Sequence, residues 1–502
     1  MYSNLLTIFL IYVVLVREYS ICIKPPNVVF ILTDDQDVVM DGMEPMVKVK
    51  KYLMNEGVTF KNMFVSSPLC CPSRSAILTG RYIHNIPVFN NSIKGNCNGE
   101  SWRQEAEKSA FITHLKNQGY RTMFAGKYLN QYGKKKGGGV KHVPPGWDSW
   151  IGLVGNSAYY NYVLSVNGTA EKHGSIYSSD YLTDLISKKA QDFLDYQTHD
   201  GAPFFMMLST PACHAPFTSA PQYSHRFNTS KSPRQPNFNI HAKDKHWLIR
   251  TAKNPMSQTS IEYLDDTFRN RWKTLLSVDD LVESVVKTLE AKKLLDNTYI
   301  FFSSDNGFHL GQYSLPTDKR QLYEFDIRVP LIVRGPGIKP NTEIQDPVMS
   351  IDLAPTFLDL GFFPPPSYMD GKSFLPLLVN NRQTNLPPQH RDMLIEYFGE
   401  HKIKIKGCPW LNNRGVAICF PDCVCEDAWN NTYSCLRFIN LTENYVFCEF
   451  LNEPNFYEYY NMKFDPYQLQ NSVNTLDPRT KTDYLMRLQK LKHCKGESCR
   501  AA

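Results

Sequence analysis

The run Asn27-Val-Val-Phe-Ile-Leu-Thr33 is almost entirely apolar and rich in β-branched residues. Such a run is typical of a strand that is covered on both faces, as in a parallel sheet. Three later runs have the same character, at residues 204–209, 299–303 and 329–333. We therefore expect these segments to be buried strands of one sheet.

Helical patterns lie between the expected strands. One covers residues 180–196 and leads into the strand at Phe204. Another is expected to begin at Ser277, because Ser277-Val-Asp-Asp280 has the form of an N-cap with an acidic first turn. Apolar residues follow at helical spacing, and we expect this helix to end near Leu295. The alternation of helix and buried strand predicts an α/β fold.

The two ends of the chain differ from this middle part. Residues 5–16 are apolar but too few to span a bilayer, so residues 1–22 are interpreted as a signal peptide. An uncleaved anchor or a buried strand is the alternative, and no other segment looks transmembrane. The composition changes at residues 364–366 and again at 380–388. We expect one domain at 25–380 and a smaller one at 388–502, with a final helix near 483–492.

The cysteines indicate an oxidising compartment. Eight of the 13 lie in the last hundred residues and predict up to four disulfides: Cys408, Cys419, Cys423, Cys425, Cys435, Cys448, Cys494 and Cys499. A zinc site near Cys423-Val-Cys425 is the alternative, but no Cys-x-x-Cys pair or histidine pattern accompanies it. Five Asn-x-Ser/Thr sequons are predicted N-glycosylation sites: Asn90, Asn167, Asn228, Asn430 and Asn440.

The charge of the chain excludes one class of partner. A formal net charge of +6 with acids and bases intermixed gives no case for nucleic acid, and no nucleic-acid-binding motif is present. Protonation of the 13 histidines at acidic pH would make the surface more basic and attract a polyanionic substrate.

Acidic side chains follow two of the expected strands. Asp34 and Asp35 come after the first strand, and Asp305-Asn306-Gly307 follows the strand at 299–303. Ligand sites form at the carboxyl ends of parallel strands, and buried carboxylates need a cation. Oxygen ligands favour Ca²⁺ or Mg²⁺. The alternative for these residues is a helix cap and a plain turn.

The segment Pro68-Leu-Cys70-Cys71-Pro72-Ser73-Arg74 is followed by Leu78-Thr79-Gly80-Arg81. One interpretation of this pattern is a structural disulfide between Cys70 and Cys71. The other is functional, because the pattern resembles the signature of the sulfatase family. The resemblance covers nearly the whole chain after residue 22. It is closest to the branch that removes 6-sulfate from N-acetylglucosamine, through stretches at residues 125–130, 238–241, 245–250, 319–325 and 420–427.

The resemblance implies a fold and two cofactors. The fold is an alkaline-phosphatase-like domain with a mostly parallel sheet between helices, plus a small disulfide-rich α+β domain with an antiparallel sheet. Cys70 would be oxidised to formylglycine by a formylglycine-generating enzyme, and its hydrate would attack sulfur. The metal would be held by Asp34, Asp35, Asp305 and Asn306 together with residue 70. The resemblance favours Ca²⁺ over Mg²⁺.

The resemblance also implies catalytic roles. Arg74 would bind the diol and the metal-binding acids, and Lys127 and Lys319 match positions that contact the sulfate or the diol. His214 matches a histidine near the leaving oxygen, as a general acid or a sulfate ligand. Many sulfatases read Gly-Lys-x-His, but Leu129 stands at the histidine's place here. His309, also a candidate substrate ligand, and His84 are alternatives for the base that this leaves unassigned.

The cysteines outside the C-terminal cluster carry one more expectation. With Cys22 near the cleavage site and Cys70 modified, eleven cysteines remain, which is an odd number, so at least one is expected to be a free thiol. The sequence assigns no partner to Cys71, Cys97 or Cys213.

The expected activity is hydrolysis of the 6-sulfate ester of N-acetylglucosamine in heparan or keratan sulfate. Three alternatives remain: a sulfatase for another sulfated sugar, a phosphohydrolase of the same superfold, and an inactive glycan-binding protein. The expected location is the lysosome, reached by the secretory pathway, with secretion as the alternative. No stable membrane anchor is expected, and a homodimer is compatible with the sequence but unsupported by it.

Overall fold

The computed structural model describes residues 24–199, 201–379, 391–400, 422, 424–453 and 456–500. The predicted signal peptide, the composition change at 380–388 and the cysteines Cys408, Cys419 and Cys423 lie outside these residues. The strands are β1 Asn27–Thr33, β2 Val58–Phe60, β3 Met63–Phe64, β4 Arg121–Gly126, β5 Ser149–Leu153, β6 Val163–Val166, β7 Thr169–Lys172, β8 Phe204–Ser209, β9 Thr298–Ser304, β10 Leu331–Arg334, β11 Thr342–Ile344, β12 Val348–Met349, β13 Arg391–Phe398, β14 Thr432–Ile439, β15 Asn444–Phe450 and β16 Tyr457–Asn461.

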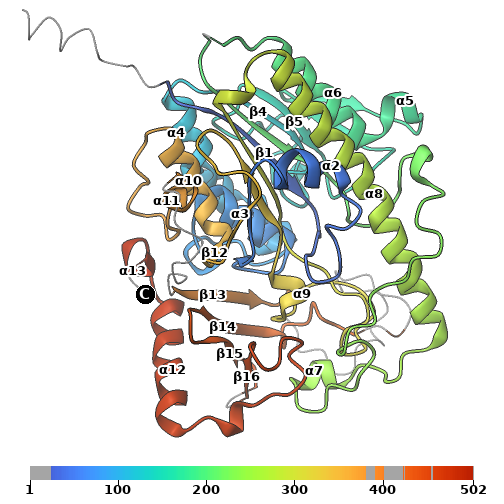
Figure 1. Cartoon of the computed structure of the whole chain (residues 1–502), viewed down its shortest axis with the longest axis vertical. Helices are drawn as coiled ribbons and strands as arrows, with labels where there is room; N and C mark the ends of the chain where they lie inside the picture. Colours follow the sequence, from blue (N-terminus) through green and yellow to red (C-terminus); the bar gives the residue numbers. More distant parts are fainter. Residues whose placement is uncertain are drawn as a thin grey trace, which may run out of the picture.

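The helices lie mostly around a large sheet (Figure 1). They are α2 Val47–Val49, α3 Cys70–Thr79, α4 Phe111–Asn117, α5 Tyr177–Asp180, α6 Leu182–Asp195, α7 Trp247–Arg250, α8 Gln258–Ala291, α9 Glu324–Ile327, α10 Leu353–Leu360, α11 Leu375–Val379, α12 Pro478–Lys492 and α13 Glu497–Arg500. In the part of the chain that the structure describes, no helix combines the length and the apolar character needed to cross a membrane.

The large sheet has ten strands in the order β11-β2-β10-β9-β1-β8-β4-β5-β6-β7. Its centre, from β9 through β1, β8 and β4 to β5, is parallel, as the apolar runs predict. The expectation for residues 329–333 was incomplete, because β10 begins at Leu331 and runs antiparallel to β9. An apolar run shows that a strand is buried but carries no information on its direction.

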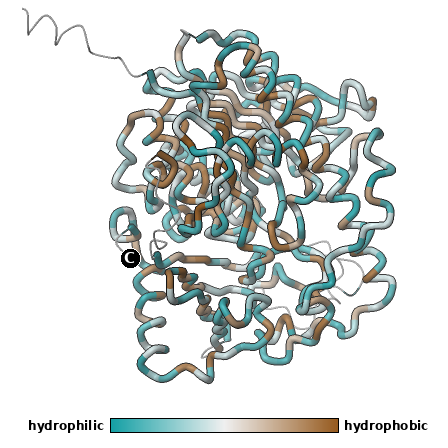
Figure 2. The backbone as a smooth tube through the Cα atoms, in the orientation of Figure 1, coloured by the Kyte–Doolittle hydropathy of each residue, from teal (hydrophilic) through white to brown (hydrophobic). Residues whose placement is uncertain are grey.

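The two faces of β1 belong to two separate cores. Val28, Phe30 and Leu32 pack in the core that contains α3, α4 and α10, whereas Val29 and Ile31 pack in the core under α6 and α8. Successive strand residues point to opposite faces, so a strand between two helical layers must be apolar throughout. Figure 2 shows the hydrophobic strands inside and hydrophilic segments at the periphery.

A second, four-stranded sheet in the order β13-β14-β15-β16 is fully antiparallel and packs against α12 (Figure 1). The α/β part, a mostly parallel sheet between two layers of helices, and this smaller antiparallel sheet together confirm the predicted fold class. The helix expected near 483–492 is α12, which is longer than predicted because it begins at Pro478 after the N-cap Asp477. It is not the final helix, since α13 follows it.

The expectation that a helix begins at Ser277 was wrong. Helix α8 runs without interruption from Gln258 to Ala291, and its N-cap is Ser257. Ser277 and Asp279 are buried inside it. The carboxylate of Asp279 accepts hydrogen bonds from the backbone N–H groups of Lys48 (2.8 Å) and Val49 (2.7 Å). The acid therefore binds the backbone of a different helix instead of its own first turn.

The structure also settles part of the cysteine chemistry. Three disulfides with both cysteines among the described residues join Cys71 to Cys97, Cys435 to Cys448 and Cys494 to Cys499. Cys425 is also disulfide-bonded, which leaves it no role in a zinc site. Among the described residues, Cys70 and Cys213 are free thiols, in agreement with the odd count.

Candidate active site

The acidic residues predicted from the strand ends lie together. Strands β1 and β9 are parallel neighbours with Thr33 opposite Ser304, so the residues that follow them meet at one edge of the sheet. The backbone N–H of Asp35 donates to the carboxylate of Asp305 (3.0 Å), and the amide of Asn306 donates to Asp35 (2.8 Å). Asp34, Asp35, Asp305 and Asn306 are all at most 1% exposed.

Cys70 is the first residue of α3 and points toward these acids. Its Sγ lies 3.9 Å from Oδ1 of Asp35. The vicinal alternative is wrong, because Cys71 bonds to Cys97 and leaves Cys70 free. Burial raises the pKa of the Cys70 thiol to about 12, although Lys127 and Lys319 act against it. An unmodified Cys70 would thus be an uncharged thiol at neutral pH.

Arg74 lies one helical turn after Cys70 and connects the acids to a neighbouring strand end. Its Nε donates to Oδ2 of Asp305 (2.7 Å), and Nη2 lies 3.6 Å from Oδ1 of Asp34. Its Nη1 donates to the carbonyl of Lys127 and to Oγ of Ser209, both at 2.7 Å. The guanidinium therefore fixes the ends of four strands, β1, β9, β4 and β8, relative to one another.

Lys127 directly follows β4, whose last residue is Gly126. Only glycine fits at position 126. A Cβ on Gly126, which has φ +114°, would lie 1.9 Å from the carbonyl oxygen of Ser209. The Nζ of Lys127 donates to Oδ2 of Asp34 at 2.6 Å. Burial alone would raise the pKa of Asp34, but Lys127, assisted by neighbouring bases, holds it well below the usual range.

Lys319 makes the equivalent contact with the second acid, Asp35. It is 4% exposed, and its Nζ donates to Oδ2 of Asp35 at 2.7 Å. The site thus contains three carboxylates, those of Asp34, Asp35 and Asp305, and three permanent cations, those of Arg74, Lys127 and Lys319. The formal charges balance before any ion or substrate is added.

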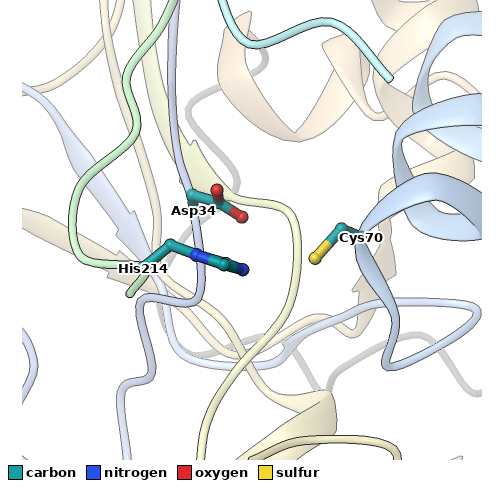
Figure 3. A group of neighbouring side chains, drawn as sticks. All are labelled: Asp34, Cys70 and His214. Atoms are coloured by element: carbon teal, nitrogen blue, oxygen red, sulfur yellow. The ribbon is translucent and has the colours of Figure 1, made fainter. Parts of the chain in front are cut away.

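His214 completes the cluster. Its Nε2 lies 3.8 Å from Oδ2 of Asp35, and its side chain is 14% exposed. Figure 3 shows the side chains of Asp34, Cys70 and His214 converging on one point, and one ligand atom from each lies within 4.8 Å of the others. His214 is the most exposed member of the cluster described so far, so it lies toward solvent.

Two oxygen atoms fit a metal ion that these residues would share. Oδ1 of Asp34 and Oδ1 of Asn306 are buried and accept no hydrogen bond from the described residues. The carboxylates of Asp34, Asp35 and Asp305 come within 4.8 Å of one another. Buried oxygen acceptors that converge in this way suit a hard divalent cation.

The structure places two predicted histidines elsewhere. His309 is fully buried, with Nδ1 3.1 Å from both carboxylate oxygens of Asp326 and Nε2 3.2 Å from Glu426. His84 contacts Glu396 and the carbonyl of Cys494. Both ring nitrogens of each histidine have a partner. Within the described residues, neither histidine lies in the cluster around Cys70. Leu129 is buried in the hydrophobic core.

Three residues of the site were not found from sequence. Ser157 donates to Oδ2 of Asp34, and Ser209 binds Arg74. Arg271, from α8, donates to the carbonyl of Asp35 and to Asp37, both at 2.8 Å. Asp35 has φ +65°, an uncommon conformation for a residue with a side chain, and Arg271 supports it. No local pattern marks Ser157 and Arg271, because both reach the site through tertiary packing. Ser209 is the last residue of the strand expected at 204–209, so its place at a strand end could have identified it.

The predicted sequons have varied surroundings. Asn167 and Asn228 are exposed, and Asn90 and Asn440 are half-buried. Asn430 is only 8% exposed. Glycosylation at all five remains a prediction.

The model of the family described as Sulfatase matches residues 26–361. The chain belongs to the sulfatase family. It is 53% identical over 480 residues to N-acetylglucosamine-6-sulfatase of Capra hircus, covering 95% of this chain and 85% of that protein. It is 52% identical to the Homo sapiens protein of the same name, covering 95% and 86%.

A solved structure supports the fold of this sulfatase. It is a protein in complex with its substrate, D-glucosamine-2-N,6-O-disulfate, and it superposes with a TM-score of 0.72 at 23% identity. The match covers 95% of this sulfatase and 99% of that chain, so it includes both sheets. The resemblance drawn from Cys70, Arg74 and the neighbouring motifs is confirmed at the level of the family.

Proposed function

We propose that this sulfatase hydrolyses the 6-sulfate ester of N-acetyl-D-glucosamine 6-sulfate units in heparan sulfate and keratan sulfate, as a step of glycosaminoglycan degradation. The observation that carries the substrate is the identity of 52–53% to mammalian N-acetylglucosamine-6-sulfatases over 95% of the chain. The buried cluster of acids and bases around Cys70 supports the chemistry.

The nucleophile is formylglycine made from Cys70. Its hydrate carries two hydroxyl groups on one carbon, so one can attack sulfur and the other can later release sulfate as the carbonyl forms again. The burial of Cys70 supports this assignment, because a buried neutral thiol is itself a poor nucleophile.

A divalent cation, Ca²⁺ in preference to Mg²⁺, is held by Asp34, Asp35, Asp305 and Asn306 with residue 70. When bound, such an ion acidifies a hydroxyl and neutralises charge on sulfate oxygens. The three carboxylates and three cationic side chains already balance, so a dication makes the site net positive. That charge favours an anionic sulfate ester.

The remaining side chains bind and orient the ester. Lys127 and Lys319 offer ammonium groups to sulfate oxygens, and Arg74 holds the acids and residue 70 in place. His214 donates a proton to the leaving sugar oxygen, a role that its position at the solvent side of the cluster supports. These cations act strongly because the site is buried and its dielectric constant is low.

The cellular setting is proposed from the sequence. Disulfides and five sequons support passage through the secretory pathway, where a formylglycine-generating enzyme would act on Cys70. Delivery to the lysosome is proposed, with secretion as the alternative, and the partners are the ends of sulfated glycosaminoglycans. We also propose a catalytic domain at 25–380 and a C-terminal domain at 388–502.

The test is an assay of purified protein on N-acetylglucosamine 6-sulfate at acidic pH. Sulfate release from that sugar is expected, and Cys70→Ala should abolish it. Release from a different sulfated sugar alone would refute the substrate. Preferential hydrolysis of phosphate esters would identify a phosphohydrolase.

Mass spectrometry tests the nucleophile directly. Trypsin should release residues 62–74 after reduction of the Cys71–Cys97 disulfide. An aldehyde at residue 70 is expected in protein made by a secretory pathway. A fully thiol residue together with retained binding of heparan sulfate would instead indicate an inactive glycan-binding protein.

A further inference from the structure

Lys319 lies in a loop formed by residues 318–321. Residues of the C-terminal part of the chain, from residue 391 onward, hold this loop in place. Lys319 is followed by Arg320, whose φ of +92° lies outside the region that residues with a side chain normally adopt. Such a conformation persists only where surrounding contacts impose it. The contacts on Arg320 therefore determine where Lys319 is placed.

Two buried side chains of the C-terminal part bind the backbone of Arg320. Its carbonyl oxygen accepts a hydrogen bond from the hydroxyl of Tyr433 at 2.9 Å and from Nδ2 of Asn431 at 3.3 Å. Tyr433 and Asn431 are both 0% exposed. Tyr433 belongs to β14, the second strand of the smaller sheet, so this carbonyl is fixed to a rigid element.

Glu400 binds the side chain of the same residue. Its Oε1 accepts from Nε of Arg320 at 2.6 Å, and the two side chains are 1% and 3% exposed. The next residue is tied in the same way, since Nε2 of Gln321 donates to Glu426 at 2.6 Å. Lys319 is thus followed by two residues that contact the C-terminal part.

Glu400 also reaches the segment that carries Cys70. Its Oε2 accepts from the backbone N–H of Asn91 at 3.4 Å. Oδ1 of Asn91 in turn accepts from the backbone N–H of Cys71 at 2.9 Å. One carboxylate therefore links the neighbour of Lys319 to the neighbour of Cys70.

We propose that Glu400, Asn431 and Tyr433 are positioning residues for the sulfatase site. They act through Arg320 to hold Lys319 against Asp35, and Glu400 acts through Asn91 to hold the start of α3. The smaller sheet is then a structural component of the catalytic centre. The catalytic consequence rests on the proposed function, because it assumes that Lys319 contacts the reacting sulfate.

Tyr433→Phe is the most conservative test, since it removes one hydroxyl and keeps the ring. The expected result is a fall in kcat of about 10-fold with KM changed less than about twofold, because a displaced Lys319 stabilises the transition state less well. Tyr120→Phe is the matched control. Its hydroxyl also donates to a buried backbone carbonyl, that of Pro26, at 2.9 Å, but it makes no contact with the 318–321 loop.

Glu400→Gln provides a second variant with its own control. The control is Glu324→Gln, which likewise removes a buried Arg–Glu ion pair. Oε1 of Glu324 lies 2.9 Å from Nε of Arg437, and this pair joins α9 to β14. Glu324 makes no contact with the 318–321 loop through this pair. Loss of kcat in Glu400→Gln but not in Glu324→Gln would separate positioning from simple attachment of the two sheets.

Amide hydrogen exchange gives a readout that does not depend on activity. Peptides covering residues 318–321 should exchange about 10-fold faster in Tyr433→Phe and Glu400→Gln than in the wild type, and should be unchanged in both controls. Equal exchange and equal kcat in variants and controls would overturn the proposal. An inactive wild type would refute the proposed function alone, because the exchange experiment would still decide whether these residues hold the loop.

Discussion

At the scale of single residues, the site is defined by pairs of opposite charge that are almost fully buried. Lys127 contacts Asp34, Lys319 contacts Asp35, and Arg74 contacts Asp305. Removing one member of a buried pair leaves the other charge without compensation. Each substitution here should therefore affect both stability and chemistry, and matched controls are needed to separate the two.

Lys127→Met keeps the length of the side chain and removes its charge. We expect kcat to fall by about 100-fold or more, since one cation that faces the reacting group is lost. Lys116→Met is the control: Lys116 pairs with Asp148, but both are exposed, at 43% and 39%. That pair should contribute less than about 1 kcal/mol and leave kcat unchanged. An equal loss of activity in both variants would contradict the role of Lys127.

Metal binding should be visible as stabilisation of the fold. If Asp34 and Asn306 direct their unpartnered oxygens at an ion, Ca²⁺ at about 100 times its Kd should add about 2.7 kcal/mol to the free energy of unfolding. Thermal unfolding with and without a chelator measures this. Asn306→Ala should weaken the response. A Tm that is the same with the chelator, Ca²⁺ and Mg²⁺ would argue against the ion.

At the scale of elements, helix α8 shows how a local pattern can mislead. Ser277 with two following acids has the form of a helix start, but the structure uses Asp279 to bind the backbone of α2. Asp279→Ala should destabilise the protein by about 1–3 kcal/mol, because it leaves the buried N–H group of Val49 and the half-buried one of Lys48 unpaired. Urea unfolding measures the change.

Asp266→Ala on the same helix is the comparison. Asp266 is 66% exposed and pairs with Arg269, three residues along the same helix. Its loss should change the free energy of unfolding by about 0.5 kcal/mol or less. A similar effect of both substitutions would show that Asp279 contributes through helix propensity alone.

The elements that could be predicted are those whose signal is local. Strands β1 and β8 match their apolar runs, and β9 is one residue longer at each end. The direction of β10 could not be predicted, because pairing depends on which strand lies beside it. In the same way, the acids at strand ends and Arg74 lie within recognisable patterns. Ser157 and Arg271 do not, since they reach the site from distant segments.

At the scale of the whole molecule, the two sheets are joined by buried charged groups. His309 lies between Asp326, on α9, and Glu426, in the segment before β14. Both carboxylates face the imidazole, and Gln321 also contacts them. The joint lies close in sequence to both Asp305 and Lys319. Its protonation state should therefore affect how firmly the C-terminal part is attached.

The stability of this joint should depend on pH. Burial alone would lower the pKa of His309, but Glu426 and Asp326 outweigh it and raise the pKa to about 10. A histidine whose pKa is raised by folding stabilises the fold fully below its ordinary value of 6.5 and loses that contribution as the pH rises through about 10. His309→Gln should therefore cost about 3 kcal/mol or more near pH 6. The difference from the wild type should shrink steadily toward pH 10. Urea unfolding across this range measures it, with the exposed His225→Gln as the control, which should show little effect at any pH. A difference that grows with pH would mean that His309 is neutral in the folded protein.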